Sequence, residues 1–201
     1  MFISHEHAYF RYLSLAGALV VFFLFFHAAI LDGDWRFGYE TISHLGISDN
    51  ALAAFLFNFG CVIAGVMFAL VGMFKIRLEK GLDAASGLFL IISAVFLALV
   101  GIISLNVNDP LHCLVAQLFG IIVTLSAVLM LIDDVNNRRW VFVVPMIFCV
   151  FIILYYWSVS FASMEVVAIG VGQFWMVLQA IRHRGLYECK PYRTFFATLD
   201  D

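Results

Sequence analysis

The chain has 201 residues, 64% of them hydrophobic, and a formal net charge of −3. Soluble domains are nearer half apolar, so the composition excludes an ordinary soluble fold and favours an integral membrane protein. The charge shows no basic excess, so we expect no nucleic-acid partner.

Six long apolar runs follow one another along the chain. A membrane-spanning helix needs roughly 20 apolar residues, whereas the strands of a membrane barrel alternate over about ten. We therefore predict an all-α fold, an integral membrane six-helix bundle that forms a single transmembrane domain over residues 1–201. The predicted helices cover residues 13–31, 51–74, 84–105, 111–132, 140–157 and 162–181.

The basic residues fall almost entirely in alternate gaps between these runs. Of the eleven Lys and Arg residues, only Arg36 lies in the first, third or fifth gap. Because cytoplasmic segments of membrane proteins are enriched in Lys and Arg, both termini are predicted to be cytoplasmic. The chain is then a multi-pass protein of the cell membrane whose outer face is acidic.

The first gap, residues 32–50, is the only long one. Its aromatic side chains suit the membrane–water interface. Residues 40–45 are expected to form one or two helical turns, with Gly46 in the left-handed stop position. Either Asp49 or Asn50 is expected to cap the next helix. We expect this outer loop to fold back over the outer ends of the helices.

The segment DPLH, residues 109–112, opens the fourth predicted helix. Asp109 suits the N-cap and Pro110 the first helical position, and the carboxylate can orient His112. Two interpretations stay open: a well-built helix start, or an oriented imidazole that binds a lipid head group or a metal.

Polar side chains are costly inside a bilayer, so each one within or beside an apolar run is a candidate functional residue. Those near the outer ends of the helices are predicted to converge and to bind a ligand. No catalytic residue can be assigned. The predicted ligand-binding residues are His27, Ser43, His44, Asn58, Asp109, His112 and Glu165.

A zinc site is the alternative for the same region. His27, His44 and His112 together with Asp109 would supply enough ligands, although no two of them have the i, i+4 spacing of a zinc-binding helix. The four cysteines show no CxxC spacing and no disulfide framework. We therefore expect no metal and no other cofactor, with zinc kept as an alternative.

Two segments resemble a known family. The stretch TISHLGISDN, followed by ALAAFLFNFGCVIAG, looks like the start of a prokaryotic family of six-helix membrane proteins of unknown function. The segment GIISLNVNDPLH is similar to the second signature of that family, and the likeness covers roughly residues 12 to 180. This resemblance implies a six-helix membrane fold and leaves the activity undefined.

A more distant resemblance is to the eukaryotic six-helix family that includes damage-regulated autophagy modulators and GPI-anchor lipid-remodelling proteins. Its recurring polar and glycine positions correspond to Ser43, Gly46, Asn58, Asp109 and His112. The chain departs from it where ISLNVND stands in place of a Phe-Pro-type turn. The resemblance implies a lipid-associated role.

Zinc-dependent membrane hydrolases related to ceramidases and adiponectin receptors offer a looser likeness. The chain contains Ser, Asp and three His residues of that kind, but its sixth predicted helix lacks the paired histidines of those enzymes. An enzyme is therefore the less favoured interpretation.

The leading hypothesis is an integral membrane protein that binds a lipid or a small amphiphile in a polar pocket of the outer leaflet. A metal-dependent membrane lipid hydrolase and a structural subunit of a membrane complex are the alternatives. Membrane lipids are the expected partners, and the sequence leaves open a homo-oligomer or a larger membrane complex.

Overall fold

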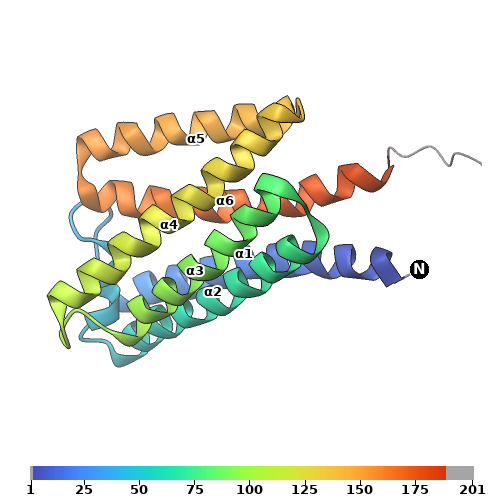
Figure 1. The fold of residues 1–201 in the computed structure, drawn as a ribbon. Helices are drawn as coiled ribbons and strands as arrows, with labels where there is room; N and C mark the ends of the chain where they lie inside the picture. Colours follow the sequence, from blue (N-terminus) through green and yellow to red (C-terminus); the bar gives the residue numbers. More distant parts are fainter. Residues whose placement is uncertain (1, 189–201) are drawn as a thin grey trace, which may run out of the picture.

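The structure is a computed structural model that describes residues 2–188, with side chains from residue 6 to residue 182. Cys189 and the basic residues that follow it lie outside this part of the chain. Six α-helices and one short 3-10 helix make up the fold (Figure 1). They are α1 (Phe2–Asp32), η1 (Ile42–Ile47), α2 (Ala51–Leu78), α3 (Gly81–Ile102), α4 (Asp109–Asn136), α5 (Trp140–Val159) and α6 (Phe161–Glu188).

All six α-helices are long and apolar enough to cross a membrane. The prediction of an all-α, six-helix integral membrane bundle is therefore confirmed. Successive helices run in opposite directions, so the start of α1 and the end of α6 lie at the same side of the bundle (Figure 1). We call this the terminal side and the opposite one the loop side. The cytoplasmic location of the terminal side stays a prediction from charge.

Small residues allow α2 and α3 to approach closely. A Cβ atom placed on Gly65 would lie 2.6 Å from the carbonyl oxygen of Ala94 and 3.1 Å from the Cβ of Ala98. In the sequence, the four-residue spacing of small residues at Gly65 and Ala69, Ala94 and Ala98, and Ala168 and Gly172 predicts close helix contacts. The structure confirms this for Gly65, Ala94 and Ala98. Gly172 on α6 differs, because a Cβ placed there would meet nothing within 4 Å. The predicted close contact at Gly172 is therefore wrong.

The core consists of two apolar clusters. One lies toward the loop side and includes Phe25, Leu45 and Phe57, whereas the other lies toward the terminal side and includes Trp175 and Met130. The loop-side cluster reaches η1, so the long loop is packed into the bundle as predicted.

Two details of the loop-side caps differ from expectation. Gly46 lies inside η1 and does not adopt a left-handed backbone. The N-cap of α4 is Asn108, whose side chain accepts from the N–H of Leu111, and Asp109 is the first helical residue. Asn50 caps α2 as predicted, because its side chain accepts from two backbone N–H groups of the first turn.

Candidate functional site

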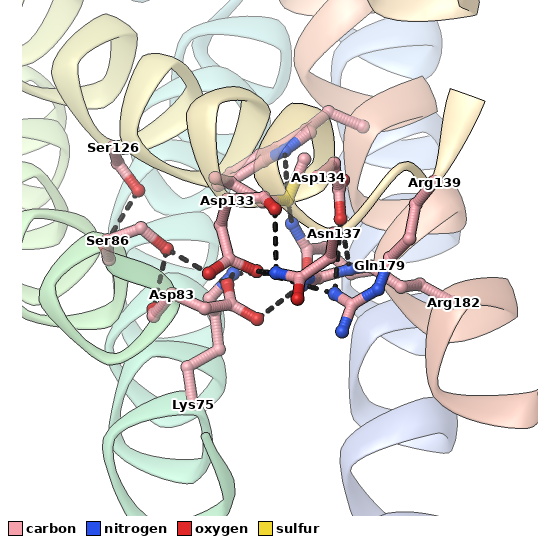
Figure 2. Close-up of polar contacts among 12 residues, drawn as sticks. Lys75, Asp83, Ser86, Ser126, Asp133, Asp134, Asn137, Arg139, Gln179 and Arg182 are labelled. Atoms are coloured by element: carbon pink, nitrogen blue, oxygen red, sulfur yellow. Dashed lines mark hydrogen bonds and ion pairs between the residues drawn. The ribbon is translucent and has the colours of Figure 1, made fainter. Parts of the chain in front are cut away.

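A network of buried ion pairs lies at the terminal side, where α2, α3, α4 and α6 meet (Figure 2). Three cations and three carboxylates take part, so the network is neutral as a whole. We call it the ionic network. Its members are Lys75, Asp83, Asp133, Asp134, Arg139 and Arg182.

Lys75 is the fully buried cation of α2. Its Nζ lies 2.6 Å from Oδ1 of Asp83 on α3 and donates to Oε1 of Gln179 on α6 at 3.2 Å. The ammonium also lies 6.0 Å from the ring centroid of Trp175, within the range of a cation–π contact. Side chains from two neighbouring helices therefore stabilise this one charge.

Arg182 connects α6 with α3 and α4. It forms ion pairs with Asp83 on α3 and, at 3.1 Å through Nη2, with Asp133 on α4. Its Nε lies 2.9 Å from Oδ1 of Asp134, at an angle that gives an ion pair and not a hydrogen bond. The guanidinium suits this position because its five N–H donors point in several directions within one plane.

Arg139 forms the partly exposed edge of the ionic network in the turn between α4 and α5. Its Nη1 lies 3.4 Å from Oδ2 of Asp133 and 3.2 Å from Oδ1 of Asp134. Asn137 donates to the same Asp133 carboxylate at 3.1 Å. The network therefore extends from the buried core to the end of the bundle.

Neutral polar groups surround these charges. Ser126 on α4 donates to the carbonyl oxygen of Ser86 on α3 at 2.7 Å. The sulfur of Met130 accepts from Nε1 of Trp175 at 3.3 Å and also from the amide of Gln179. Each of these contacts joins α4 to another helix within about two turns of the ion pairs.

The main effect of such a network is to hold the helices together. Removing one member of a buried ion pair costs about 3–5 kcal/mol, because the remaining charge has no partner in a low-dielectric surrounding. Lys75, Arg182, Asp83 and Asp134 are almost completely buried, and their two positive and two negative charges compensate one another. They leave no uncompensated charge to attract a ligand.

Glu79 lies beside the ionic network in the turn between α2 and α3. Its side chain is partly buried, and burial raises the pKa of this carboxyl above its ordinary value. The negative charge of Asp83 raises the pKa further, while Arg182 and Lys75 oppose the shift. Glu79 is thus the titratable group at the membrane edge whose protonation the network influences.

The loop side is built differently, since its polar side chains mainly hold the backbone of the long loop. Glu165 on α6 accepts from the N–H of Ile42 at 2.9 Å and from Oγ of Ser43 at 3.2 Å. This carboxylate therefore anchors the start of η1. Ser43 and Glu165 are the pair of predicted ligand-binding residues that the structure joins by a hydrogen bond.

Asn58 and His112 also bind backbone carbonyls. The amide of Asn58 donates to the carbonyl oxygen of Gly46 at 2.9 Å. Nδ1 of His112 lies 2.6 Å from the carbonyl oxygen of Ile103, so Nδ1–H is the donor and the ring is held across the α3–α4 turn. Nε2 of His112 is buried and makes no hydrogen bond with the described residues.

The other three predicted ligand-binding residues lie at the surface. His27 is exposed and bonds to the carbonyl oxygen of Phe23 on its own helix at 2.7 Å. His44 bonds to the hydroxyl of Thr41 at 2.8 Å. Asp109 accepts from the thiol of Cys113 one turn further along α4. The seven residues therefore share one side of the bundle without forming one cluster.

A metal centre would need several ligands in one place. Among the residues that the structure describes, no group of three or more His, Cys, Asp or Glu side chains is arranged to hold a metal ion. The four residues that the sequence suggested for zinc are all described, and they do not form such a group. The expectation that the protein uses no cofactor stays a prediction.

A polar pocket of about 230 Å³ lies under the long loop, at the loop-side ends of α1 and α2. Four carboxylates and one indole line it, and its lining includes no Lys or Arg. The lining residues are Asp32, Asp34, Trp35, Glu40, His44, Ile47, Ser48, Asp49 and Asn50. We call it the acidic pocket.

Hydrogen bonds fix the walls of the acidic pocket. The backbone N–H of Trp35 donates to Oδ2 of Asp32 at 2.7 Å, and its indole Nε1 donates to the carbonyl oxygen of Thr41 at 3.1 Å. Asn50 donates from its side chain to the carbonyl oxygen of Leu31 at 2.8 Å, which joins the end of α1 to the start of α2. The pocket is therefore preformed.

Sequence reasoning missed the ionic network and all but His44 of the acidic pocket. The predicted helices ended at residues 74, 132 and 181, so Lys75, Asp134 and Arg182 were assigned to solvent-exposed gaps and tails. The helices continue beyond those points and carry the charges into the bundle. The available signal was that cations and carboxylates flank the same ends of the apolar runs and need partners there.

Comparison with known proteins agrees with this architecture. Residues 15–182 match the family described as "Protein of unknown function (DUF998)", which covers most of the chain. The protein is therefore a six-helix membrane protein of that family, and the predicted membership of a family of unknown function is confirmed at this level. Searches of curated proteins and of solved structures found no match. The more distant resemblance to the autophagy-modulator and GPI-lipid-remodelling family stays a prediction.

Proposed function

We propose that this membrane protein binds an amphiphile with a cationic amine head group in the acidic pocket. The observation that carries the proposal is the lining of that pocket, in which four carboxylates and an indole meet without a Lys or Arg side chain. Carboxylates attract an amine, and an aromatic face adds a cation–π contact to an ammonium group.

The position of the acidic pocket favours a membrane-bound ligand over a soluble one. Asp32 is the last residue of α1 and Asn50 caps α2, so the pocket lies where two membrane-crossing helices end. Lipid head groups occupy that level of a bilayer. By the positive-inside rule, the loop side faces the outer leaflet.

The amine would lie among the carboxylates while the apolar tails remain in the bilayer. Asp34 and Glu40 would compensate the charge, and Trp35 would contact the alkyl groups of the ammonium. Since Trp35 is already held by two hydrogen bonds, binding requires little ordering of the pocket. Within this proposal His44 is the one predicted ligand-binding residue that touches the ligand.

Native mass spectrometry of the purified protein tests the proposal. The probes are a diacyl trimethylammonium lipid and phosphatidylglycerol with the same acyl chains, added in equal amounts. We expect the cationic lipid to be retained preferentially, and Asp34→Asn to reduce that preference about threefold to tenfold, as expected for one ion pair plus partial loss of the cation–π geometry.

The matched control is Asp109→Asn, which removes the same charge from the loop side but does not line the acidic pocket. It should leave the preference almost unchanged. Equal losses in the two variants would mean that the lipid responds only to the overall negative charge of this face, and the proposal would be wrong. Equal retention of both lipids by the unmodified protein would also contradict it.

The two alternatives from the sequence, a metal-dependent lipid hydrolase and a structural subunit, stay predictions. Hydrolysis of a lipid ester by protein that has been loaded with zinc, and its loss in His112→Ala, would favour the hydrolase over a binding protein. Copurification of a stable different protein would favour the structural subunit.

A further inference from the structure

We propose that α4 forms a symmetric dimer with α4 of a second copy of this chain, through a seam centred on Gln117. The seam consists of Leu114, Gln117, Ile121, Thr124 and Val128, which follow the alternating three- and four-residue spacing of a coiled-coil core. This inference is independent of the proposed function.

All five seam residues are exposed in the single chain. The relative exposures are 51% for Leu114, 59% for Ile121 and 43% for Val128, and Gln117 and Thr124 are exposed as well. On its other faces α4 packs against α3 and, over a shorter length, against α5, and its terminal-side end contacts α6. The seam is thus the face of α4 that the six-helix bundle leaves uncovered.

Gln117 distinguishes this face from one that simply contacts lipid. It lies about 8 Å from the midpoint of α4, since the helix rises 1.5 Å per residue, and so within a hydrocarbon core of about 30 Å. Among residues 6–182, whose side chains the structure describes, none forms a hydrogen bond with its amide. An amide without a partner at that depth is unfavourable, and lipid tails cannot supply one.

A second copy supplies the partner by symmetry. In one membrane two copies share the same orientation, so a two-fold axis along the membrane normal brings each residue near the axis opposite itself at equal depth. A glutamine amide is both donor and acceptor, so two copies of Gln117 can satisfy each other reciprocally. An unrelated partner would need a polar side chain at that same depth.

Two neighbours of Gln117 agree with a close helix pair. A Cβ placed on Gly120 would meet nothing within 4 Å, so this position leaves room for another backbone. The hydroxyl of Thr124 already donates a hydrogen bond to the carbonyl oxygen of Gly120 at 2.7 Å. Thr124 therefore needs no further hydrogen-bond partner within an apolar seam. A single polar core position is also the device that fixes register in such pairs.

Disulfide trapping in membranes tests the seam. The background variant carries Cys113→Ser and Cys189→Ser, which leaves the buried Cys61 and Cys149. Thr124→Cys then places a thiol at a core position, where two copies in a parallel pair can reach disulfide distance. We expect copper phenanthroline to convert most of this variant into a covalent dimer of the chain.

Phe148→Cys is the matched control, because Phe148 is 65% exposed on α5 and lies as close to the midpoint of its helix as Thr124 does. Random collision would crosslink both variants equally, and that result would overturn the proposal. A crosslinked product that contains a different protein would overturn it as well, because the second copy is the stated partner.

The role of Gln117 is tested by a second measurement that does not depend on cysteine chemistry. Förster transfer between labelled copies in liposomes gives the association constant. Gln117→Leu should weaken association about threefold to twentyfold, the range measured for hydrogen bonds between membrane helices. Gln173→Leu, a matched change at mid-membrane on α6, should leave it unchanged. Association that is equal in both variants would contradict the assignment of Gln117.

Discussion

The two ends of the bundle handle charge in opposite ways. At the terminal side, three cations and three carboxylates pair with one another, and their central members are buried. At the loop side, four carboxylates line an open pocket whose lining includes no Lys or Arg. The comparison separates charges that hold helices together from charges that remain available to a ligand.

The difference follows from where each charge lies in the chain. Lys75, Asp83, Asp134 and Arg182 lie within helices and point into the bundle, so each must find a partner in the protein. The acidic residues of the loop lie at helix ends or between them, where water reaches them. The buried charges at one end therefore hold the helices together, and the charges at the other end that have no cationic partner support the proposed binding of an amine.

The largest expected effect comes from breaking the ionic network at its centre. Asp83→Asn keeps the shape of the side chain but leaves Lys75 and Arg182 without their shared carboxylate. We expect the free energy of unfolding to fall by about 3–5 kcal/mol, measured by titration with sodium dodecyl sulfate in mixed micelles. Arg77→Gln is the control, because the pair between Arg77 and Glu6 is exposed and contributes little. A change at Asp83 no larger than the control would mean that the network does not hold the helices.

A second test compares two helical glycines. Gly65→Ala places a methyl group 2.6 Å from the carbonyl oxygen of Ala94, so α2 and α3 must separate. We expect a loss of about 1–3 kcal/mol in the same titration. Gly172→Ala meets no atom within 4 Å and should be neutral or stabilising by up to about 1 kcal/mol, since alanine favours helix. The same sign in both variants would contradict the close contact of α2 with α3.

A third test addresses the anchor of the loop. Glu165→Gln replaces the carboxylate that accepts from the N–H of Ile42 and the hydroxyl of Ser43 with an amide that has one acceptor. We expect the η1 segment to open more readily by about 1–2 kcal/mol, which corresponds to about tenfold faster hydrogen exchange. Exchange of α5 amides serves as the internal control. Unchanged exchange in η1 would show that Glu165 does not hold it.

The sequence predicted the fold better than the site, for a physical reason. Apolar runs of about 20 residues leave few structures other than spanning helices, so the six helices and their order followed directly. Asn50 as the cap of α2 and the close contact at Gly65 also followed from local patterns. Gly46 and Asp109 did not, because their roles depend on how η1 and the α3–α4 turn pack.

The site could not be derived in the same way, because it depends on distances between helices. Ser43 and Glu165 are 122 residues apart in the chain, and Lys75 and Gln179 are 104 apart. A residue pattern shows that a polar group needs a partner but does not identify the partner. The ionic network depends on where the helices end, because a few additional helical residues move a charge from water into the bundle.

The smallest expected effect concerns Glu79, which lies just outside the helices beside the ionic network. Burial raises the pKa of its carboxyl, so the folded protein binds this proton at higher pH than the unfolded chain does. Between the ordinary pKa and the raised pKa the folded state therefore holds more protons, and stability falls as pH rises through that window. Glu79→Gln stays neutral at every pH and should remove this part of the pH dependence.

Unfolding titrations of both proteins between about pH 4.5 and 7.5 measure the difference in stability between them. This difference should favour the unmodified protein more at the acidic end. A difference that grows toward neutral pH would mean that nearby cations outweigh burial, and that Glu79 belongs to the ionic network itself.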